Sequence, residues 1–260
     1  MLYKRIIFAL LFFEGNFYLS RNFRLQKVGD IDWIKKNYDF GKTCNSLDEL
    51  IILNVKKNSN INDKKVFFNT IKRIKKNFFL PLTLGGGIRN FEDAKEMFEK
   101  GADKVVINTL FYNNFLEIEK IANTYGNQAS TLMIDYKQDK DNQYFCYKNS
   151  GQEKAEPINK FFIEKINKCL CGDVIFNSID LDGSGMGPDI NFIISQVFKK
   201  FLKPTLLMGG FGNSSHILKA LNIKKISGIV TANLFNFLGN GLVDCRKNIL
   251  IYKKYLASFE

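Results

Sequence analysis

The sequence repeats itself at a spacing of about 124 residues, and this repeat limits the folds that the chain can adopt. Residues 81–90, PLTLGGGIRN, have their counterpart in residues 204–213, PTLLMGGFGN. Residues 108–111 match residues 232–235 at the same spacing. A repeat of half the chain predicts that each half forms a similar set of elements.

Short apolar runs alternate with amphipathic stretches, which is typical of βα units around a parallel sheet. In residues 91–100, Phe91, Ala94 and Met97 share one face, Asn90 is placed to cap the helix and Gly101 to end it. Four strands in each half predict a closed (βα)₈ TIM barrel rather than an open doubly wound sheet. We expect one domain over 1–260, with half-barrels of about 1–128 and 129–260. The eight strands are expected at about 5–11, 49–55, 80–85, 103–108, 129–135, 172–178, 204–209 and 226–232.

The formal net charge of +12 raises the question of a nucleic-acid partner. Lysine is spread through the whole chain, and the densest basic run, 72–76, has the spacing of one solvated helix face. We therefore expect no nucleic-acid partner, although the charge is compatible with phosphorylated small molecules. No apolar run reaches the length of a membrane span, and residues 1–13 fit a buried strand better than a signal peptide.

The five cysteines have no regular spacing, so a disulfide framework is not expected. A reducing, cytoplasmic setting is the default expectation for such a chain. Cys169 and Cys171 have no second pair of metal ligands, and we expect neither a metal nor a cofactor. The only histidine, His216, falls in an expected helix, which leaves nucleophilic Ser-His or Cys-His chemistry without its usual base.

Glycine-rich turns follow two of the expected strands, where the active sites of such barrels lie. Glycines let backbone N–H groups approach an anion, and the next helix adds the positive end of its dipole. Two such turns suit a substrate with a phosphate at each end, although glycines can also serve only to make tight turns. The residues expected to bind phosphate are Gly86, Gly87, Asn108 and Thr109 in the first half, and Gly209, Gly210, Ala232 and Asn233 in the second.

Asp135 ends an otherwise apolar strand, where a carboxylate is costly to bury and faces the mouth of the barrel. It is therefore a candidate general acid or base. The repeat pairs Asp135 with Leu11, which cannot transfer a proton. Asp180 and Asp182 lie on the loop after strand six and are candidate substrate-loop residues, or else form a turn with Gly183.

Charged residues of alternating sign stand at the opposite ends of the expected strands. Together they are candidates for a charged ring that closes the bottom of the barrel, or else are solvated strand ends. These residues are Arg5, Glu49, Lys104 and Asp173.

The chain resembles HisF, the cyclase subunit of imidazole glycerol phosphate synthase, over nearly its whole length. The matching segments are residues 4–7, 22–23, 28–30, 85–89, 101–105, 107–109, 178–183 and 209–210. The resemblance implies that a glutaminase docks on the barrel bottom and that ammonia passes through the charged ring and the barrel interior. At the top it would attack a bis-phosphorylated substrate in a cyclase reaction that yields imidazole glycerol phosphate. By this resemblance the ring residues gate ammonia, and Asp103 faces the glutaminase.

The sequence departs from the cyclase pattern at catalytic positions. The cyclase pattern has two catalytic aspartates. Asp135 matches one of them, and Leu11 stands in place of the other. Leu19 replaces a lysine that reaches the substrate. Asn54 replaces an aspartate, Asp173 a glutamate and Asn233 a serine. Asn177, a candidate substrate-loop residue with Asp180 and Asp182, replaces a threonine on strand six. These changes suggest that ammonia delivery is kept while the chemistry of the top face has changed.

This pattern resembles divergent HisF paralogues that act in the modification of bacterial surface sugars. In those systems a HisF-like barrel and a glutaminase supply ammonia to a separate sugar amidotransferase, which converts an acetamido group to an acetamidino group. One alternative is a working cyclase of histidine biosynthesis, although loss of an acid–base partner costs on the order of 10²–10⁴-fold in rate. A second alternative is a non-catalytic scaffold that only activates a glutaminase.

Overall fold

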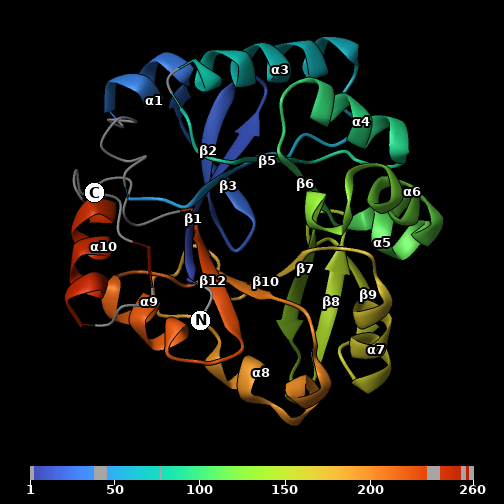
Figure 1. Ribbon diagram of the computed structural model, residues 1–260, viewed down its shortest axis with the longest axis vertical. Coiled ribbons are helices and arrows are strands. Elements are labelled where there is room, and N and C mark those ends of the chain that lie inside the picture. Colours follow the sequence, from blue (N-terminus) through green and yellow to red (C-terminus); the bar gives the residue numbers. More distant parts are fainter. Residues whose placement is uncertain (1–2, 38–45, 77, 233–240, 253–255, 258–260) are drawn as a thin grey trace.

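A computed structural model describes residues 3–37, 46–76, 78–232, 241–252 and 256–257. At its centre lies a closed barrel of eight parallel strands, in which the last strand pairs with the first (Figure 1). The predicted TIM barrel is therefore confirmed, and each of the eight expected strands is found within three residues of its expected bounds. The strands are β1 (Arg5–Phe13), β4 (Glu49–Asn54), β5 (Leu82–Gly85), β6 (Lys104–Ile107), β7 (Ser130–Gln138), β10 (Asp173–Ser178), β11 (Thr205–Met208) and β12 (Ile226–Thr231).

Helices surround the barrel on its outside (Figure 1). In α4 the expected features are confirmed, because the Asn90 side chain accepts a hydrogen bond from the Asp93 backbone N–H, Ala94 and Met97 are buried, and Gly101 has a φ of +100°. The helices are α1 (Ile31–Asn37), α3 (Ile61–Lys75), α4 (Phe91–Glu99), α5 (Thr109–Asn113), α6 (Phe115–Tyr125), α7 (Lys160–Lys168), α8 (Ile190–Ile194), α9 (Ser214–Leu221) and α10 (Gly241–Tyr252), with 3-10 turns at Asn127–Ala129 and Gln196–Lys200. Among the described residues, no helix is both long and apolar enough to cross a membrane.

The strands separate two apolar clusters, because successive side chains point to opposite faces of a strand. The larger cluster lies between strands and helices and contains Phe8, Ile52 and Phe176. The smaller cluster contains alternate residues of the same strands, such as Ile7 and Ile51, and fills the barrel interior. The interior of the barrel is thus filled by apolar side chains.

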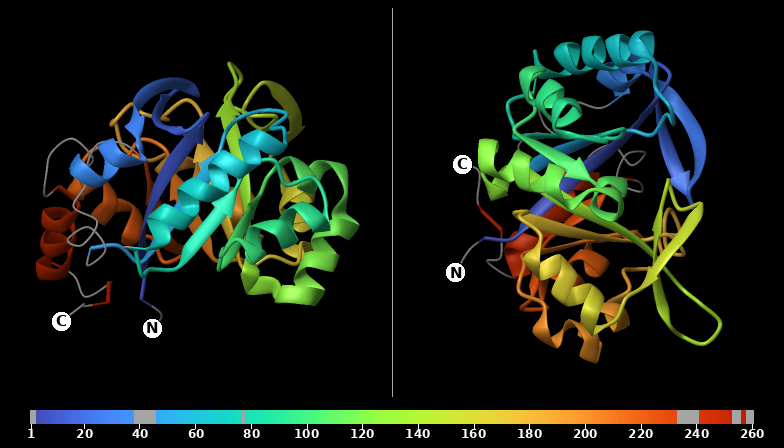
Figure 2. Two further views of the ribbon diagram at one scale, coloured as in Figure 1. Left: turned by 90° about the horizontal axis from the view of Figure 1, so that it is seen from above. Right: turned by 90° about the vertical axis from the view of Figure 1, so that its right-hand side faces the viewer.

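Two β-hairpins that the sequence did not predict extend the first strand of each expected half. Strands β2 (Asn16–Arg21) and β3 (Arg24–Asp30) continue β1, and β8 (Tyr144–Lys148) and β9 (Glu153–Pro157) continue β7. Both hairpins lie at the end of the barrel opposite to the start of β1, as the two views of Figure 2 show. They lack long apolar runs and β3 is largely exposed, which is why a search for apolar strands misses them.

Candidate functional site

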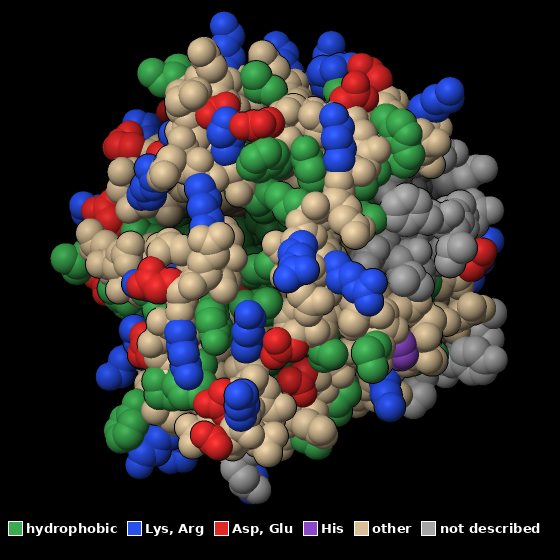
Figure 3. Space-filling model, turned by 180° about the vertical axis from the view of Figure 1, so that it is seen from behind, with side chains coloured by type: hydrophobic (Ala, Val, Ile, Leu, Met, Phe, Trp, Pro, Cys, Tyr) green, Lys and Arg blue, Asp and Glu red, His purple; other side chains and the backbone are tan. Residues whose placement is uncertain are grey.

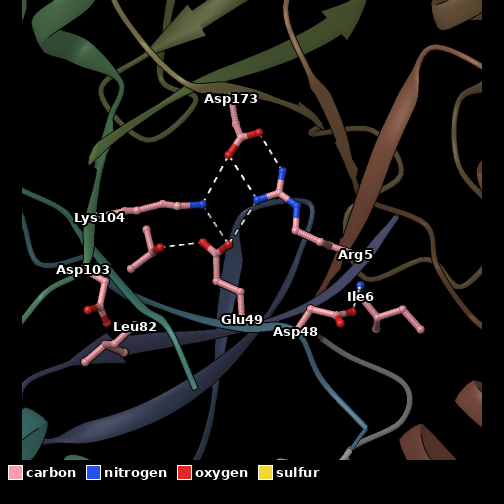
Figure 4. Close-up of polar contacts among 9 residues, drawn as sticks. Arg5, Ile6, Asp48, Glu49, Leu82, Asp103, Lys104 and Asp173 are labelled. Atoms are coloured by element: carbon pink, nitrogen blue, oxygen red, sulfur yellow. Dashed lines mark hydrogen bonds and ion pairs between the residues drawn. The ribbon is translucent and has the colours of Figure 1, made fainter. Parts of the chain in front are cut away.

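At the amino ends of the strands, which we call the bottom, four charged side chains form one closed ring (Figure 4). Arg5 bonds Asp173 with N–O distances of 2.6 and 3.2 Å and Glu49 at 3.3 Å. Lys104 bonds the same two carboxylates, at 3.1 Å to Glu49 and 3.3 Å to Asp173. Thr83 Oγ1 donates to the other oxygen of Glu49 at 2.5 Å. Each cation therefore bridges both anions across the barrel axis.

Two members of the ring, Asp173 and Arg5, are stabilised in their charged forms although both are largely buried. Burial alone would raise the pKa of Asp173, but Arg5 and Lys104 hold that pKa below its ordinary value. Burial likewise opposes the charge of Arg5, yet Asp173 and Glu49 keep the pKa of the guanidinium above its ordinary value. Asp103 lies beside this ring, exposed on the bottom face, and accepts a hydrogen bond from the Leu82 N–H at 2.8 Å.

Above the ring, the barrel interior is lined by apolar side chains. Those described are Ile7, Ala9, Leu11, Ile51, Leu53, Val106, Met133, Ile175, Leu206, Met208 and Val230. These side chains offer no charge and no hydrogen bond, so an ion in this interior would lose its hydration without compensation.

At the carboxyl ends of the strands, which we call the top, Asp135 is held by two amides. Asn108 Nδ2 donates to Asp135 Oδ2 at 2.9 Å, and Asn177 Nδ2 donates to Asp135 Oδ1 at 2.8 Å. Strands β6, β7 and β10 are neighbours, so the three side chains meet in one layer of the interior. The sequence placed Asn108 at a phosphate turn, whereas its side chain contacts the candidate acid–base group.

The environment of Asp135 opposes its ionisation. Burial raises its pKa to about 7, against the opposing effect of the two amide hydrogen bonds, and the nearby Asp182 carboxylate raises it further. Asp135 therefore changes protonation state near neutral pH, as a general acid or base requires.

The opposite side of the mouth, formed by β1 and β4, is apolar. Leu11 and Leu53 both belong to the interior cluster, and Tyr18 of β2 packs against it. Leu19, also on β2, is buried. Figure 3 looks onto this end of the molecule, where a hollow near the centre is lined by hydrophobic side chains with Lys and Arg around it.

The first glycine turn, after β5, is closely packed at Gly86 and open at Gly87. Gly86 has a φ of +97°, and a Cβ there would lie 1.9 Å from the Asn54 carbonyl oxygen. Gly87 has a φ of +74° and open space where a Cβ would be. Thr109 begins α5, and its hydroxyl lies 3.4 Å from Asn108 Oδ1.

The second glycine turn, after β11, borders a small cavity. A Cβ at Gly210 would lie 2.0 Å from the Gly187 carbonyl oxygen, so only glycine fits there. The cavity has a volume of about 20 Å³, and Ala232 and Asp182 lie in its wall with Gly209 and Met208. Asn233, the last residue expected here, lies outside the described residues.

Hydrogen bonds join the loop after β10 to the first hairpin, β2–β3, at the top of the barrel. Asp182 Oδ2 accepts hydrogen bonds from Ser20 Oγ at 2.5 Å and from the Phe23 N–H at 3.0 Å. Asp180 instead accepts from the Gln138 N–H at 3.2 Å, on β7. Asp182 therefore holds a hydroxyl and a backbone N–H, Asp180 holds a backbone N–H, and neither acts only within a local turn.

Other candidates take no part in this arrangement. His216 lies half-buried in α9, where Nδ1 accepts from the Gly212 N–H at 3.2 Å. Over the described part of the chain, no group of three or more His, Cys, Asp or Glu side chains is placed to hold a metal ion.

Comparison with known proteins gives a consistent result. The family model described as "Histidine biosynthesis protein" matches residues 38–239. A putative imidazole glycerol phosphate synthase subunit hisF2 from Parasynechococcus marenigrum (strain WH8102) is 40% identical over 242 residues, covering 92% of this chain and 87% of the relative. The HisF subunits of Streptococcus sanguinis (strain SK36) and Azobacteroides pseudotrichonymphae genomovar. CFP2 are each 30% identical, covering 95% and 98% of this chain and 96% of each relative.

Proposed function

The chain belongs to the histidine biosynthesis protein family and resembles HisF subunits of imidazole glycerol phosphate synthase, and from this we propose that it is an ammonia-receiving barrel subunit. The observation that carries the proposal is the closed ring of Arg5, Glu49, Lys104 and Asp173 beneath an apolar interior. The partner is a HisH-like glutaminase that docks on the bottom face.

The ring and the interior suit neutral ammonia. Four coupled charges across the axis block free passage, and moving one of them breaks two ion pairs. An apolar lining then lets a small neutral molecule pass while it holds back ions and disfavours water. A docked partner that draws Lys104 or Arg5 aside would open this path. Asp103, exposed beside the ring, belongs to the docking surface.

At the top, the chain offers one acid–base carboxylate. Asp135 is buried and amide-bound, while the equivalent position in the first half is Leu11, packed in the interior cluster. A cyclase reaction that uses two carboxylates for proton transfer would find only one of them in this chain. The glycine turns after β5 and β11 remain suited to the phosphates of a phosphorylated ligand.

The finer proposal is that ammonia serves an amidotransfer. The chain would supply ammonia, directly or through a docked sugar amidotransferase, for conversion of an acetamido group to an acetamidino group on a bacterial surface sugar such as a nonulosonic acid. What supports a role apart from that of HisF is Leu11, which stands where the second half carries Asp135 and cannot transfer a proton. The intact Asp135 and glycine turns favour the second candidate, a cyclase of histidine biosynthesis.

The discriminating experiment supplies ammonium chloride and the bis-phosphorylated cyclase substrate to the purified chain, without any glutaminase. We expect no cyclase turnover from the natural chain. Turnover at a rate typical of a working cyclase would overturn the proposal in favour of the histidine-pathway enzyme.

The variant Leu11→Asp, with Leu11→Asn as a matched control for polarity, sharpens this experiment. If the top face still binds the cyclase substrate, Leu11→Asp gains turnover and Leu11→Asn does not. If the substrate has changed, both variants remain inactive.

A further inference from the structure

Two cysteines, Cys169 and Cys171, lie in the connection between α7 and β10 and take no part in the site at the top of the barrel. Cys169 is the first residue after α7, and its N–H donates to the Ile166 carbonyl oxygen at 3.0 Å. The Cys171 N–H donates in turn to the Cys169 carbonyl oxygen at 3.0 Å. This bond closes a turn of three residues around Leu170.

The turn brings the two sulfur atoms together. The side chains of Cys169 and Cys171 are free thiols that share a hydrogen bond. A hydrogen bond from residue i+2 back to residue i also holds their Cα atoms close, and a disulfide requires Cα atoms about 4.4–6.8 Å apart. Two thiols in this arrangement can form a bond after a small rotation of their side chains.

The surroundings favour a thiolate on Cys171. The Cys169 thiol donates a hydrogen bond to the Cys171 sulfur, and this bond is the main reason that the pKa of Cys171 lies below its ordinary value. Lys203, whose Nζ donates to the Cys171 carbonyl oxygen at 3.4 Å, lowers that pKa further, whereas burial and Asp173 oppose the shift. The shared hydrogen bond also raises the pKa of Cys169. Because the thiolate is the nucleophile, Cys171 is the attacking group and Cys169 the resolving one.

The pair is enclosed but lies just beneath the surface. Cys169 and Cys171 are 1% and 4% exposed, whereas Leu170 and Gly172, which alternate with them, are partly exposed. A small oxidant therefore reaches the sulfur atoms through a local movement of this turn. A disulfide across a single residue closes a small, strained ring, and strained disulfides are the readily reduced ones. In a reducing compartment such disulfides are transient and serve in redox sensing.

We propose that Cys169 and Cys171 are a site of reversible oxidation, at which hydrogen peroxide converts the two thiols to a disulfide. The Cys171 thiolate attacks one oxygen of the peroxide, so the O–O bond breaks, an S–O bond forms, and hydroxide leaves and becomes water by taking a proton. The Cys169 thiol then attacks the sulfur of this sulfenic acid. The S–O bond breaks, the S–S bond forms and a second water leaves. The two thiols lose two electrons, which reduce the peroxide to two water molecules.

Oxidation should act on the ring, because Gly172 alone separates Cys171 from Asp173. A disulfide tightens the turn that leads into β10 and shifts the Asp173 carboxylate against its ion-pair partners, Arg5 and Lys104. The oxidised chain should therefore accelerate glutamate formation by a HisH-like glutaminase at least threefold less than the reduced chain. This consequence rests on the proposed function, whereas the disulfide itself does not.

The test exposes the isolated, folded chain to hydrogen peroxide, then blocks the remaining thiols with N-ethylmaleimide in denaturant and digests the chain with trypsin. One peptide, residues 169–199, contains both cysteines and no other. We expect the mass of this peptide to fall by two hydrogen atoms and the peptide to carry no label. After treatment with dithiothreitol before labelling, it should carry two labels.

Cys146 and Cys245 are the internal controls, since burial raises the pKa of Cys146 to about 11 and that of Cys245 to about 12. Both should remain labelled at a peroxide concentration that oxidises the pair. Absence of the mass loss, addition of oxygen at the pair without a disulfide, or equal oxidation of the controls would overturn the site.

Variants separate the roles of the two cysteines. Cys169→Ser keeps a hydroxyl that can donate to Cys171, so Cys171 should form a sulfenic acid that dimedone traps. In Cys171→Ser, trapping at Cys169 should be at least tenfold slower. Lys203→Met should slow disulfide formation at least threefold, and Lys203→Arg should restore it. Equal trapping in the two serine variants, or a natural rate in Lys203→Met, would contradict the assigned attack by Cys171.

The two proposals fail in different ways. The mass measurement uses no glutaminase, so it decides on the disulfide whether or not a partner docks. In the glutaminase assay, peroxide should lower the stimulation by the natural chain and not that by Cys169→Ser. A disulfide that leaves glutamate formation unchanged would overturn the link to the ring. A chain that stimulates no glutamate formation in either redox state would refute the proposed function and leave the disulfide site standing.

Discussion

At the scale of single residues, the top of the barrel is divided into a polar and an apolar side. The position of Asp135 could be predicted from sequence, because a carboxylate after an apolar strand stands out. The role of the Asn108 side chain could not, since it depends on which strand lies beside β6. That register places Asn108 within reach of both Asp135 and the Met133 carbonyl.

Asp135 should make the stability of the protein depend on pH. Its pKa is about 7 in the folded chain against 3.8 for an ordinary aspartate, so the folded state holds a proton that the unfolded state has lost between these values. Stability therefore falls as pH rises from about 4 to 7. Asp135→Asn should be more stable than the natural chain at pH 8 by about 1–3 kcal/mol and should gain nothing at pH 4.

Urea unfolding of both proteins at pH 4, 6 and 8 measures this difference. Asn37→Ala, on an exposed part of α1, removes no titratable group and serves as the control. A difference for Asp135→Asn that stays constant with pH would contradict the assigned ionisation.

At the scale of elements, the barrel was predictable and the two hairpins were not. Apolar runs mark the eight barrel strands because both faces of each strand are buried. The tip of the first hairpin instead depends on tertiary contacts, since Phe23 adopts a φ of +62° while its backbone N–H donates to Asp182. A residue other than glycine with a positive φ is unusual, and no local sequence pattern predicts it.

Gly183→Ala should detach the first hairpin from the loop after β10. Gly183 has a φ of +66°, and a Cβ there would lie 2.2 Å from the Ser20 carbonyl oxygen. Amide hydrogen exchange in β2 and β3 should rise at least tenfold, because the bonds to Asp182 would be lost.

Gly87→Ala is the matched control for this prediction. It carries the same backbone penalty, with a φ of +74°, but nothing lies within 4 Å of its Cβ. Exchange in β2 and β3 should stay near the natural rate in this variant. If both variants accelerate exchange equally, backbone strain rather than the lost contact is responsible.

At the scale of the whole molecule, the two ends of the barrel have different chemistry. The bottom carries the closed ion-pair ring, and the top carries Asp135 and the glycine turns, with the apolar interior between them. The ring positions could be predicted from sequence as strand ends. Their joining into one ring could not, because it depends on barrel closure and on side-chain reach across the axis.

Charge reversal at the bottom should weaken docking of the glutaminase. Asp103→Lys places a cation on the exposed face beside the ring, and co-purification with a tagged HisH-like glutaminase should fall at least tenfold. Asp141→Lys reverses an exposed charge in the turn between β7 and β8, at the opposite end, and should co-purify normally. Thermal unfolding should verify that both variants fold, since Asp103 also bonds the Leu82 N–H. Normal co-purification of Asp103→Lys would place the partner elsewhere.

The most direct measurement combines the chain, a HisH-like glutaminase, glutamine and the bis-phosphorylated cyclase substrate, and follows glutamate and imidazole glycerol phosphate together. An ammonia-receiving subunit with altered top-face chemistry predicts that the chain accelerates glutamate formation at least tenfold while no imidazole glycerol phosphate appears. Equal amounts of both products would identify a working cyclase and contradict the changed chemistry. Glutamate formation unaffected by the chain would contradict the ammonia-receiving role itself.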